Sequence, residues 1–265
     1  MLTDTHCHLY LDNFQNDIQE IIERAWQSGV ERLLIPGLNI ETSKQAIALS
    51  DQYENIFAAV GFHPNESQNW NEGSLSQLEE LITHPKVVAI GEIGLDYYRK
   101  YSSHSIQQNV FQIQLELAAN YDLPIIIHNR DAIQDLWPIL LKWQTSLKKN
   151  GKMIAERPGI FHSFSGELSI AMEITSHHFL LGISGPVTYR KSTQLQSVAA
   201  KISLERMVLE TDAPFLAPHP HRGHRNEPAH IRFTAQRIAE LQNKSLKETA
   251  NITSRNADQL FLWRA

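Results

Sequence analysis

The feature that most constrains the fold of this chain is a regular alternation of short apolar runs with longer amphipathic segments. Runs such as residues 56–60 and 124–127 are too short for helices and contain β-branched residues, which favours buried strands. Segments such as residues 105–121 carry apolar residues at helical spacing instead. Because near-continuous apolar strands that alternate with helices form parallel sheets, the pattern predicts an α/β fold.

Eight strand-helix units can be counted along the 265 residues. Strands are expected at residues 2–8, 32–36, 56–60, 87–90, 124–127, 159–161, 179–183 and 207–209. Helices are expected at residues 15–26, 42–53, 75–82, 105–121, 133–147, 168–176, 195–202 and 228–241, with an extra helix at 246–262. Eight units predict a (β/α)8 TIM barrel. The rival is a doubly wound open sheet, which more often has fewer strands and a Gly-rich first turn that this chain lacks.

With 42% hydrophobic residues, the composition suits either one large α/β domain or two small ones. No linker, low-complexity tract or repeat divides the chain, so we expect a single domain over residues 1–265. The single cysteine, Cys7, excludes an internal disulfide. The first residues lack the pattern of a signal peptide, and the apolar runs are too short to span a bilayer. We therefore expect a cytoplasmic protein that needs neither a membrane nor a protein partner.

Histidine is abundant, with 13 residues against one cysteine, which suits catalytic rather than structural metal sites. His6 and His8 would share one face of the first strand, since side chains alternate along a strand. Two imidazoles on one face are half of a divalent-metal site, although solvent-facing or core histidines are the alternative.

The residues just past the other apolar runs are mostly polar. They are Gly37, His63, Glu92, His128, His162, Ser184, Gly185 and Asp212. In a (β/α)8 barrel these positions meet at the C-terminal ends of the strands, where the catalytic groups of this fold lie. Any one of them has an ordinary structural explanation, but four histidines and two carboxylates at one rim favour a catalytic metal site.

The motifs at these positions resemble those of TatD-type metal-dependent hydrolases, commonly described as deoxyribonucleases. They are Asp4-Thr5-His6-Cys7-His8, Gly61-Phe62-His63-Pro64, Gly91-Glu92-Ile93-Gly94-Leu95-Asp96-Tyr97, Ile127-His128, Phe161-His162-Ser163-Phe164-Ser165-Gly166 and Leu209-Glu210-Thr211-Asp212-Ala213-Pro214. The resemblance runs from the first strand to Pro228 and implies a barrel of the metallo-dependent hydrolase type.

The resemblance also implies two divalent metal ions. His6, His8 and Asp212 would hold one ion, His128 and His162 the other, and Glu92 would bridge them. Two such ions can activate water and stabilise a phosphodiester displacement, with Asp212 placed to orient the water and take its proton. Mixed imidazole and carboxylate ligands suit zinc or manganese, and magnesium stays open because it supports activity in similar proteins.

The expected substrate is DNA, single-stranded or at its ends, because the pocket of a barrel cannot easily admit a duplex. A net charge of −5 leaves phosphate binding to local groups. Candidates are His63, Arg130, Arg222 and Arg225, and each also has a structural interpretation as a packed or solvated loop residue. His224 stands where similar proteins often carry lysine, which leaves the substrate affinity of this loop open.

Two other functions remain compatible with the sequence. One is an amidohydrolase- or esterase-like enzyme that acts on a small molecule or on an aminoacyl ester at a nucleic-acid end. The other is a binding protein that keeps the barrel without the chemistry, against which the intact set of six predicted ligands argues.

Overall fold

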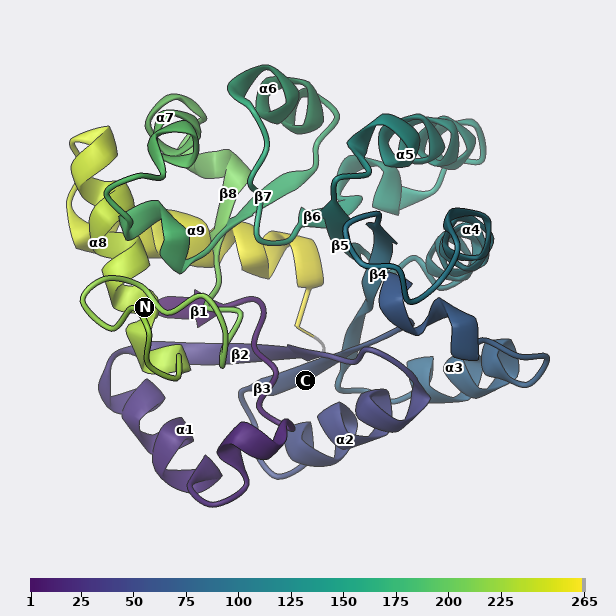
Figure 1. Ribbon diagram of the computed structural model, residues 1–265, viewed down its shortest axis with the longest axis horizontal. Coiled ribbons are helices and arrows are strands. Elements are labelled where there is room, and N and C mark those ends of the chain that lie inside the picture. Colours follow the sequence, from purple (N-terminus) through teal and green to yellow (C-terminus); the bar gives the residue numbers. More distant parts are fainter. Residues whose placement is uncertain (264–265) are drawn as a thin grey trace. The chain divides into compact units, whose positions relative to one another are not determined.

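The structure is a computed structural model that describes residues 1–263, and it divides into two compact units. Unit 1 comprises residues 1–35 and 163–259, and unit 2 comprises residues 36–162 and 260–263. Each unit combines parallel strands with helices (Figure 1). The prediction that residues 1–265 form one domain stays a prediction.

Unit 1 contains the first two and the last two strands of the chain. Its strands are β1 (Leu2–Asp4), β2 (Val30–Pro36), β7 (Leu180–Ile183) and β8 (Met207–Leu209). Its helices are α1 (Ile18–Gln27), α6 (Leu168–Ser176), α7 (Thr193–Lys201), α8 (Ile231–Gln242) and α9 (Leu246–Phe261), and the last residues of β2 and α9 belong to unit 2. Parallel pairs form between β1 and β2 and between β7 and β8.

Unit 2 contains the third to sixth strands of the chain. Its strands are β3 (Ile56–Val60), β4 (Val87–Asp96), β5 (Ile125–Arg130) and β6 (Gly159–Phe161). Its helices are α2 (Ile40–Ser50), α3 (Ser74–Ile82), α4 (His104–Tyr121) and α5 (Ile133–Lys149). The strands pair in parallel in the order in which they occur in the chain.

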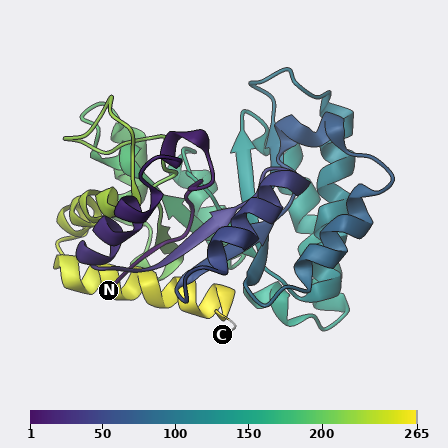
Figure 2. The same ribbon diagram turned by 90° about the horizontal axis from the view of Figure 1, so that it is seen from below.

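The strands of unit 2 are apolar along their length because helices cover them. All residues of β3 and β4 are buried. Helix α2 packs on β3, α4 on β4 and α5 on β5 (Figure 1). Figure 2 shows these helices, in blue to teal, beside the strands of the unit. Burial on both faces explains why the sequence shows continuous apolar runs rather than alternation.

The extra helix predicted near the C-terminus is α9, which packs in unit 1 near the N-terminus (Figure 2). Asn256 is buried and donates from Nδ2 to the carbonyl oxygens of Leu204 and Met207, each at 2.7 Å. Ser254 Oγ donates to the carbonyl oxygen of Met1 at 3.4 Å. The helix therefore holds the starts of β1 and β8.

Several predicted strand ends differ from the observed ones, and three of the differences concern the candidate site. The fifth strand, β5, runs to Arg130 rather than Ile127, so His128 lies inside it. The first strand ends at Asp4, so His6 and His8 follow it rather than lie on it. The fourth runs to Asp96 rather than Ile90, so Glu92 lies inside it. Gly91, Glu92 and Gly94 interrupt the apolar run in the sequence, but the pairing with β5 continues past them.

Candidate metal centre

In unit 1, backbone hydrogen bonds draw the segment after β1 to the segment after β8. Cys7 forms an isolated parallel bridge with Ala213, and His8 N donates to the carbonyl oxygen of Ala213 at 2.7 Å. Asp212 N donates to the carbonyl oxygen of His6 at 2.8 Å. These bonds keep the backbone extended past the end of β1, so the two histidines still share a side.

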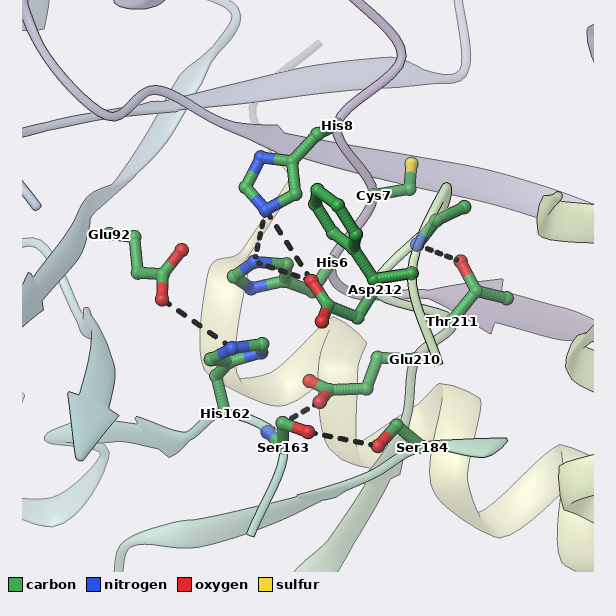
Figure 3. A network of polar contacts seen from close by, with 12 residues as sticks. His6, Cys7, His8, Glu92, His162, Ser163, Ser184, Glu210, Thr211 and Asp212 are labelled. Atoms are coloured by element: carbon green, nitrogen blue, oxygen red, sulfur yellow. Dashed lines mark hydrogen bonds and ion pairs between the residues drawn. The ribbon is translucent and has the colours of Figure 1, made fainter. Parts of the chain in front are cut away.

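The result is a group of His6, His8 and Asp212, called here the unit 1 triad (Figure 3). His6 Nε2 lies 3.1 Å from His8 Nε2. Asp212 Oδ1 lies 3.5 Å from His8 Nε2 and 3.8 Å from His6 Nε2. Three ligand atoms of the kinds that bind transition metals therefore converge on one point.

Asp4 fixes the backbone beneath the unit 1 triad. Its fully buried carboxylate accepts hydrogen bonds from Thr211 Oγ1 at 2.6 Å and Thr211 N at 2.9 Å, and from His6 N at 3.3 Å. Burial raises the pKa of Asp4 to about 8, although the hydrogen bonds from Thr211 oppose that rise. The contact joins Asp4, two residues before His6, to Thr211, which directly precedes Asp212.

The other ring nitrogen of His8 also has a partner. His8 Nδ1 lies 3.0 Å from the hydroxyl oxygen of Tyr10. A hydrogen bond there fixes the ring orientation and directs Nε2 toward Asp212, as is usual for histidines that bind metals.

In unit 2, Glu92 lies at the centre of three histidines, and these four residues are called the unit 2 cluster. Glu92 Oε1 lies 2.7 Å from His128 Nδ1, 3.4 Å from His162 Nε2 and 3.7 Å from His63 Nε2. Figure 3 shows the Glu92–His162 contact. Glu92 is 2% exposed, so these imidazoles rather than water surround its carboxyl group.

Strand register positions the unit 2 cluster. His128 pairs with Gly94 in the ladder between β4 and β5, and the register shifts between Ile90 and Ile93 of β4. Such an irregularity re-aims side chains, and it spans Glu92. Gly94 has a φ of +143°, and a Cβ there would lie 2.0 Å from the carbonyl oxygen of His128, so only glycine fits.

His128 lies between two carboxylates. Its Nε2 is 3.2 Å from Asp96 Oδ2, while Nδ1 faces Glu92. Burial alone would lower the pKa of His128, but hydrogen bonds with Asp96 and Glu92 outweigh burial and raise the pKa. Burial would likewise raise the pKa of Asp96, but hydrogen bonds from His128 and from the Arg99 backbone hold it below its usual range.

His63 differs from the other histidines of the unit 2 cluster in its hydrogen bonding. Its Nδ1 accepts a hydrogen bond from Asn65 N at 3.0 Å. A neutral imidazole that accepts at Nδ1 carries its proton on Nε2. Since Nε2 is the atom near Glu92, neutral His63 acts as a hydrogen-bond donor there, which fits substrate contact better than metal ligation.

Both ligand groups fit a divalent cation by their chemistry. The ligand atoms of His6, His8 and Asp212 lie within 4.8 Å of one another. In unit 2, Glu92 Oε1 lies 2.7 Å from His128 Nδ1 and 3.4 Å from His162 Nε2. Imidazole nitrogen with carboxylate oxygen suits zinc or manganese, whereas magnesium prefers oxygen ligands.

The arginines predicted to bind substrate have different surroundings. Arg130 Cζ lies 3.7 Å from the ring centroid of Tyr98, and Arg222 Cζ lies 4.5 Å from that of Tyr189. Arg225 instead forms a bidentate pair with Asp17, with N–O distances of 2.9 and 2.5 Å, and donates to the carbonyl oxygen of Asn13. A carboxylate therefore already occupies the guanidinium of Arg225.

The sequence-based predictions assigned no role to Glu210, which is fully buried in unit 1 (Figure 3). Glu210 Oε1 accepts a hydrogen bond from Ser163 N at 2.5 Å, and Ser163 Oγ lies 3.0 Å from Ser184 Oγ. Ser163 has a φ of +44°, so this contact supports a backbone conformation that serine seldom adopts. A charged residue directly after the apolar run of β8 was the available signal.

Comparison with known proteins agrees with the motifs. The family model described as "TatD related DNase" matches residues 3–262. This chain belongs to that family. It is 42% identical to the "Uncharacterized metal-dependent hydrolase YabD" of Bacillus subtilis, over 98% of this chain and 99% of the relative. It is 33% identical to the "3'-5' ssDNA/RNA exonuclease TatD" of Escherichia coli, over 97% and 98%.

The solved structures confirm the predicted fold class of this TatD family member. The crystal structure of the TatD homologue YjjV from Escherichia coli matches with a TM-score of 0.88 and 32% identity, over 98% of each chain. The fold is thus the (β/α)8 TIM barrel of metallo-dependent hydrolases. The chain is a metal-dependent hydrolase, as its family and its ligand groups indicate. Among the described residues, no helix is long and apolar enough to cross a membrane.

Proposed function

We propose that this TatD family hydrolase cleaves phosphodiester bonds of single-stranded DNA or RNA from the 3′ end. The observation that carries the proposal is the unit 1 triad, in which Asp212 Oδ1 faces two buried imidazoles within 3.8 Å. A relative that is 33% identical over almost the whole chain is named a 3′-5′ exonuclease of single-stranded DNA and RNA.

For the metal we propose one divalent ion at the unit 1 triad and one at Glu92, His128 and His162. Such ions, when bound, neutralise phosphate charge and make water a nucleophile near neutral pH. The donor chemistry favours zinc or manganese over magnesium. That Glu92 bridges the two ions stays a prediction from the family resemblance.

The protein's own residues would then position the water and the substrate. Asp212 Oδ1 is directed at His6 and His8, and we assign to Oδ2 the orientation of the attacking water and the removal of its proton. His63 donates from Nε2 to a phosphate oxygen, since its Nδ1 is an acceptor for Asn65 N.

Arg130 and Arg222 are assigned to phosphate binding, because the guanidinium of each lies over the ring of a tyrosine. Arg225 is assigned to holding its loop through Asp17.

Arg222→Gln should therefore raise KM for an oligonucleotide by about tenfold. The matched variant Arg225→Gln should lower stability by about 1 kcal/mol, with the larger effect on unfolding rather than on KM.

The experiment that tests the function uses 5′-labelled single-stranded DNA and RNA oligomers beside a panel of small esters. The purified protein is analysed for metal, then assayed before and after chelation and after addition of zinc, manganese or magnesium. We expect a ladder that shortens from the 3′ end, is lost with the metal and returns with it. Ester turnover that exceeds oligonucleotide cleavage by orders of magnitude would overturn the proposal.

A further inference from the structure

Phe215 is a large apolar side chain that unit 1 leaves in solvent close to its ligand group. It lies three positions after Asp212 and is 51% exposed. Its ring centroid is 6.3 Å from that of His8, with an interplanar angle of 64°. One exposed aromatic residue is common on protein surfaces, so its position alone would mean little.

The backbone that carries Phe215 is fixed on its N-terminal side. Phe215 N donates to the carbonyl oxygen of Asp212 at 2.8 Å. The buried Asn226 donates from Nδ2 to the carbonyl oxygens of Phe215 and Thr211, at 2.7 and 2.8 Å. Phe215 therefore moves with the backbone of the unit 1 triad.

The backbone is also fixed on its C-terminal side. Gly185 approaches the loop so closely that a Cβ would lie 2.1 Å from the carbonyl oxygen of Leu216. The hydroxyl of Tyr189 donates to the carbonyl oxygen of Ala217 at 2.8 Å. The fold thus holds the main chain on both sides of Phe215 and leaves the ring exposed to solvent.

The same loop carries a cation. Arg222 is stacked on Tyr189, the residue that anchors the loop at Ala217. The Phe215 ring and the Arg222 guanidinium match the two parts of a nucleotide. Every base has a π-face that can stack on an aromatic ring, and a phosphate can bind the guanidinium.

We infer that Phe215 is the stacking surface for the nucleobase of the terminal nucleotide whose phosphodiester reaches the unit 1 triad. This inference rests on the proposed nuclease function and adds to it the group that recognises the base. Stacking requires a π-face rather than particular hydrogen-bond donors, so the enzyme should accept all four bases and discriminate against a nucleotide without a base.

The test compares two single-stranded DNA oligomers that differ only in the 3′-terminal nucleotide, which is either deoxyadenosine or an abasic tetrahydrofuran. We expect kcat/KM of the wild-type enzyme to be about tenfold or more higher for the base-bearing oligomer, and this ratio to approach one in Phe215→Ala. Phe215→Tyr, which keeps a ring, should preserve the ratio, whereas Phe215→Leu should lose it.

A binding measurement gives a readout independent of turnover. The same two oligomers with a terminal methylphosphonate linkage, which resists cleavage, should show the same ratio in Kd by fluorescence anisotropy. Met172→Ala is the matched control, because Met172 on α6 is 59% exposed and lies outside the site. It should leave both ratios at the wild-type value.

The outcomes separate the two hypotheses. If the wild-type enzyme cleaves the oligomers but the ratio is equal in Phe215→Ala and wild type, the stacking role is wrong and the nuclease function stands. If only small apolar esters lose turnover in Phe215→Ala, the ring serves another ligand and the inference is overturned. If the wild-type enzyme cleaves neither oligomer, the proposed function itself fails.

Discussion

The unit 1 triad and the unit 2 cluster use the same ligand types but are built differently. In unit 2, Glu92 and His128 lie within paired strands, and ladder register sets their distance of 2.7 Å. In unit 1, all three ligands follow strand ends, and loop hydrogen bonds hold them at 3.1 to 3.8 Å from one another.

The outer contacts of the two groups differ as well. His128 is held by the carboxylate of Asp96, whereas His8 is held by the neutral hydroxyl of Tyr10. A carboxylate partner makes an imidazole a stronger ligand than a hydroxyl partner does. We therefore expect an ion at Glu92, His128 and His162 to be bound more tightly than one at the unit 1 triad.

The largest expected effect concerns Asp212, the residue proposed to take the proton from the attacking water. Asp212→Asn keeps the size of the side chain but removes its ability to take a proton, so kcat on a single-stranded oligomer should fall by at least about 10³-fold. Asp258→Asn is the control, because Asp258 pairs with Arg32 at 3.0 Å, away from the ligands. Activity of Asp212→Asn within tenfold of wild type would remove Asp212 from its proposed role.

Metal affinity should distinguish the two groups next. Asp96→Asn should weaken metal binding by about 10- to 100-fold, because His128 loses its carboxylate partner. Tyr10→Phe should weaken binding by less than about tenfold. Competition with a fluorescent chelator measures both, and a larger effect for Tyr10→Phe would reverse the comparison.

Stability should reveal how far the unit 1 triad depends on the Asp4–Thr211 contact. Thr211→Val removes the hydroxyl that lies 2.6 Å from Asp4 Oδ2 and leaves a buried carboxyl group with one partner fewer, which should lower the free energy of unfolding by about 1–3 kcal/mol. The control is Thr145→Val, since Thr145 is exposed on α5. Urea denaturation measures both, and equal effects would show that Asp4 does not brace this segment.

The smallest expected effect is a pH dependence in the loop after β8 of unit 1. His230 is stacked on His221, with ring centroids 4.0 Å apart, and burial followed by the charge of His221 lowers the pKa of His230 to about 4. Between pH 6.5 and 4 the histidine is protonated in the unfolded chain but not in the folded protein. The free energy of unfolding therefore decreases as the pH is lowered through this window.

After allowance for partial exposure, we expect this loss to be about 1–2 kcal/mol. Denaturation of wild type and His230→Gln at pH 7 and pH 5 measures it. The variant should lose less stability than wild type on acidification. Identical losses in both proteins would assign the pH dependence to other groups.

Local patterns were sufficient to predict most of the elements, because helical and strand periodicity is a property of neighbouring residues. They were less reliable at the site. The run at residues 87–90 predicted a strand that ended before Glu92, whereas pairing with β5 carries β4 to Asp96 across two glycines. Glycine in a sequence indicates an interruption, but here Gly94 fits the close approach of the His128 backbone.

The sequence by itself determined the fold class and which residues have side chains that can bind a metal or take up a proton, since both follow from residue type and spacing along the chain. Only the tertiary structure decided the partners. Asp4 meets Thr211 across 207 positions, and Arg225, one of the predicted phosphate ligands, meets Asp17 across 208. The reason is physical: a side chain's hydrogen-bond partner depends on distance in space, which spacing along the chain does not encode.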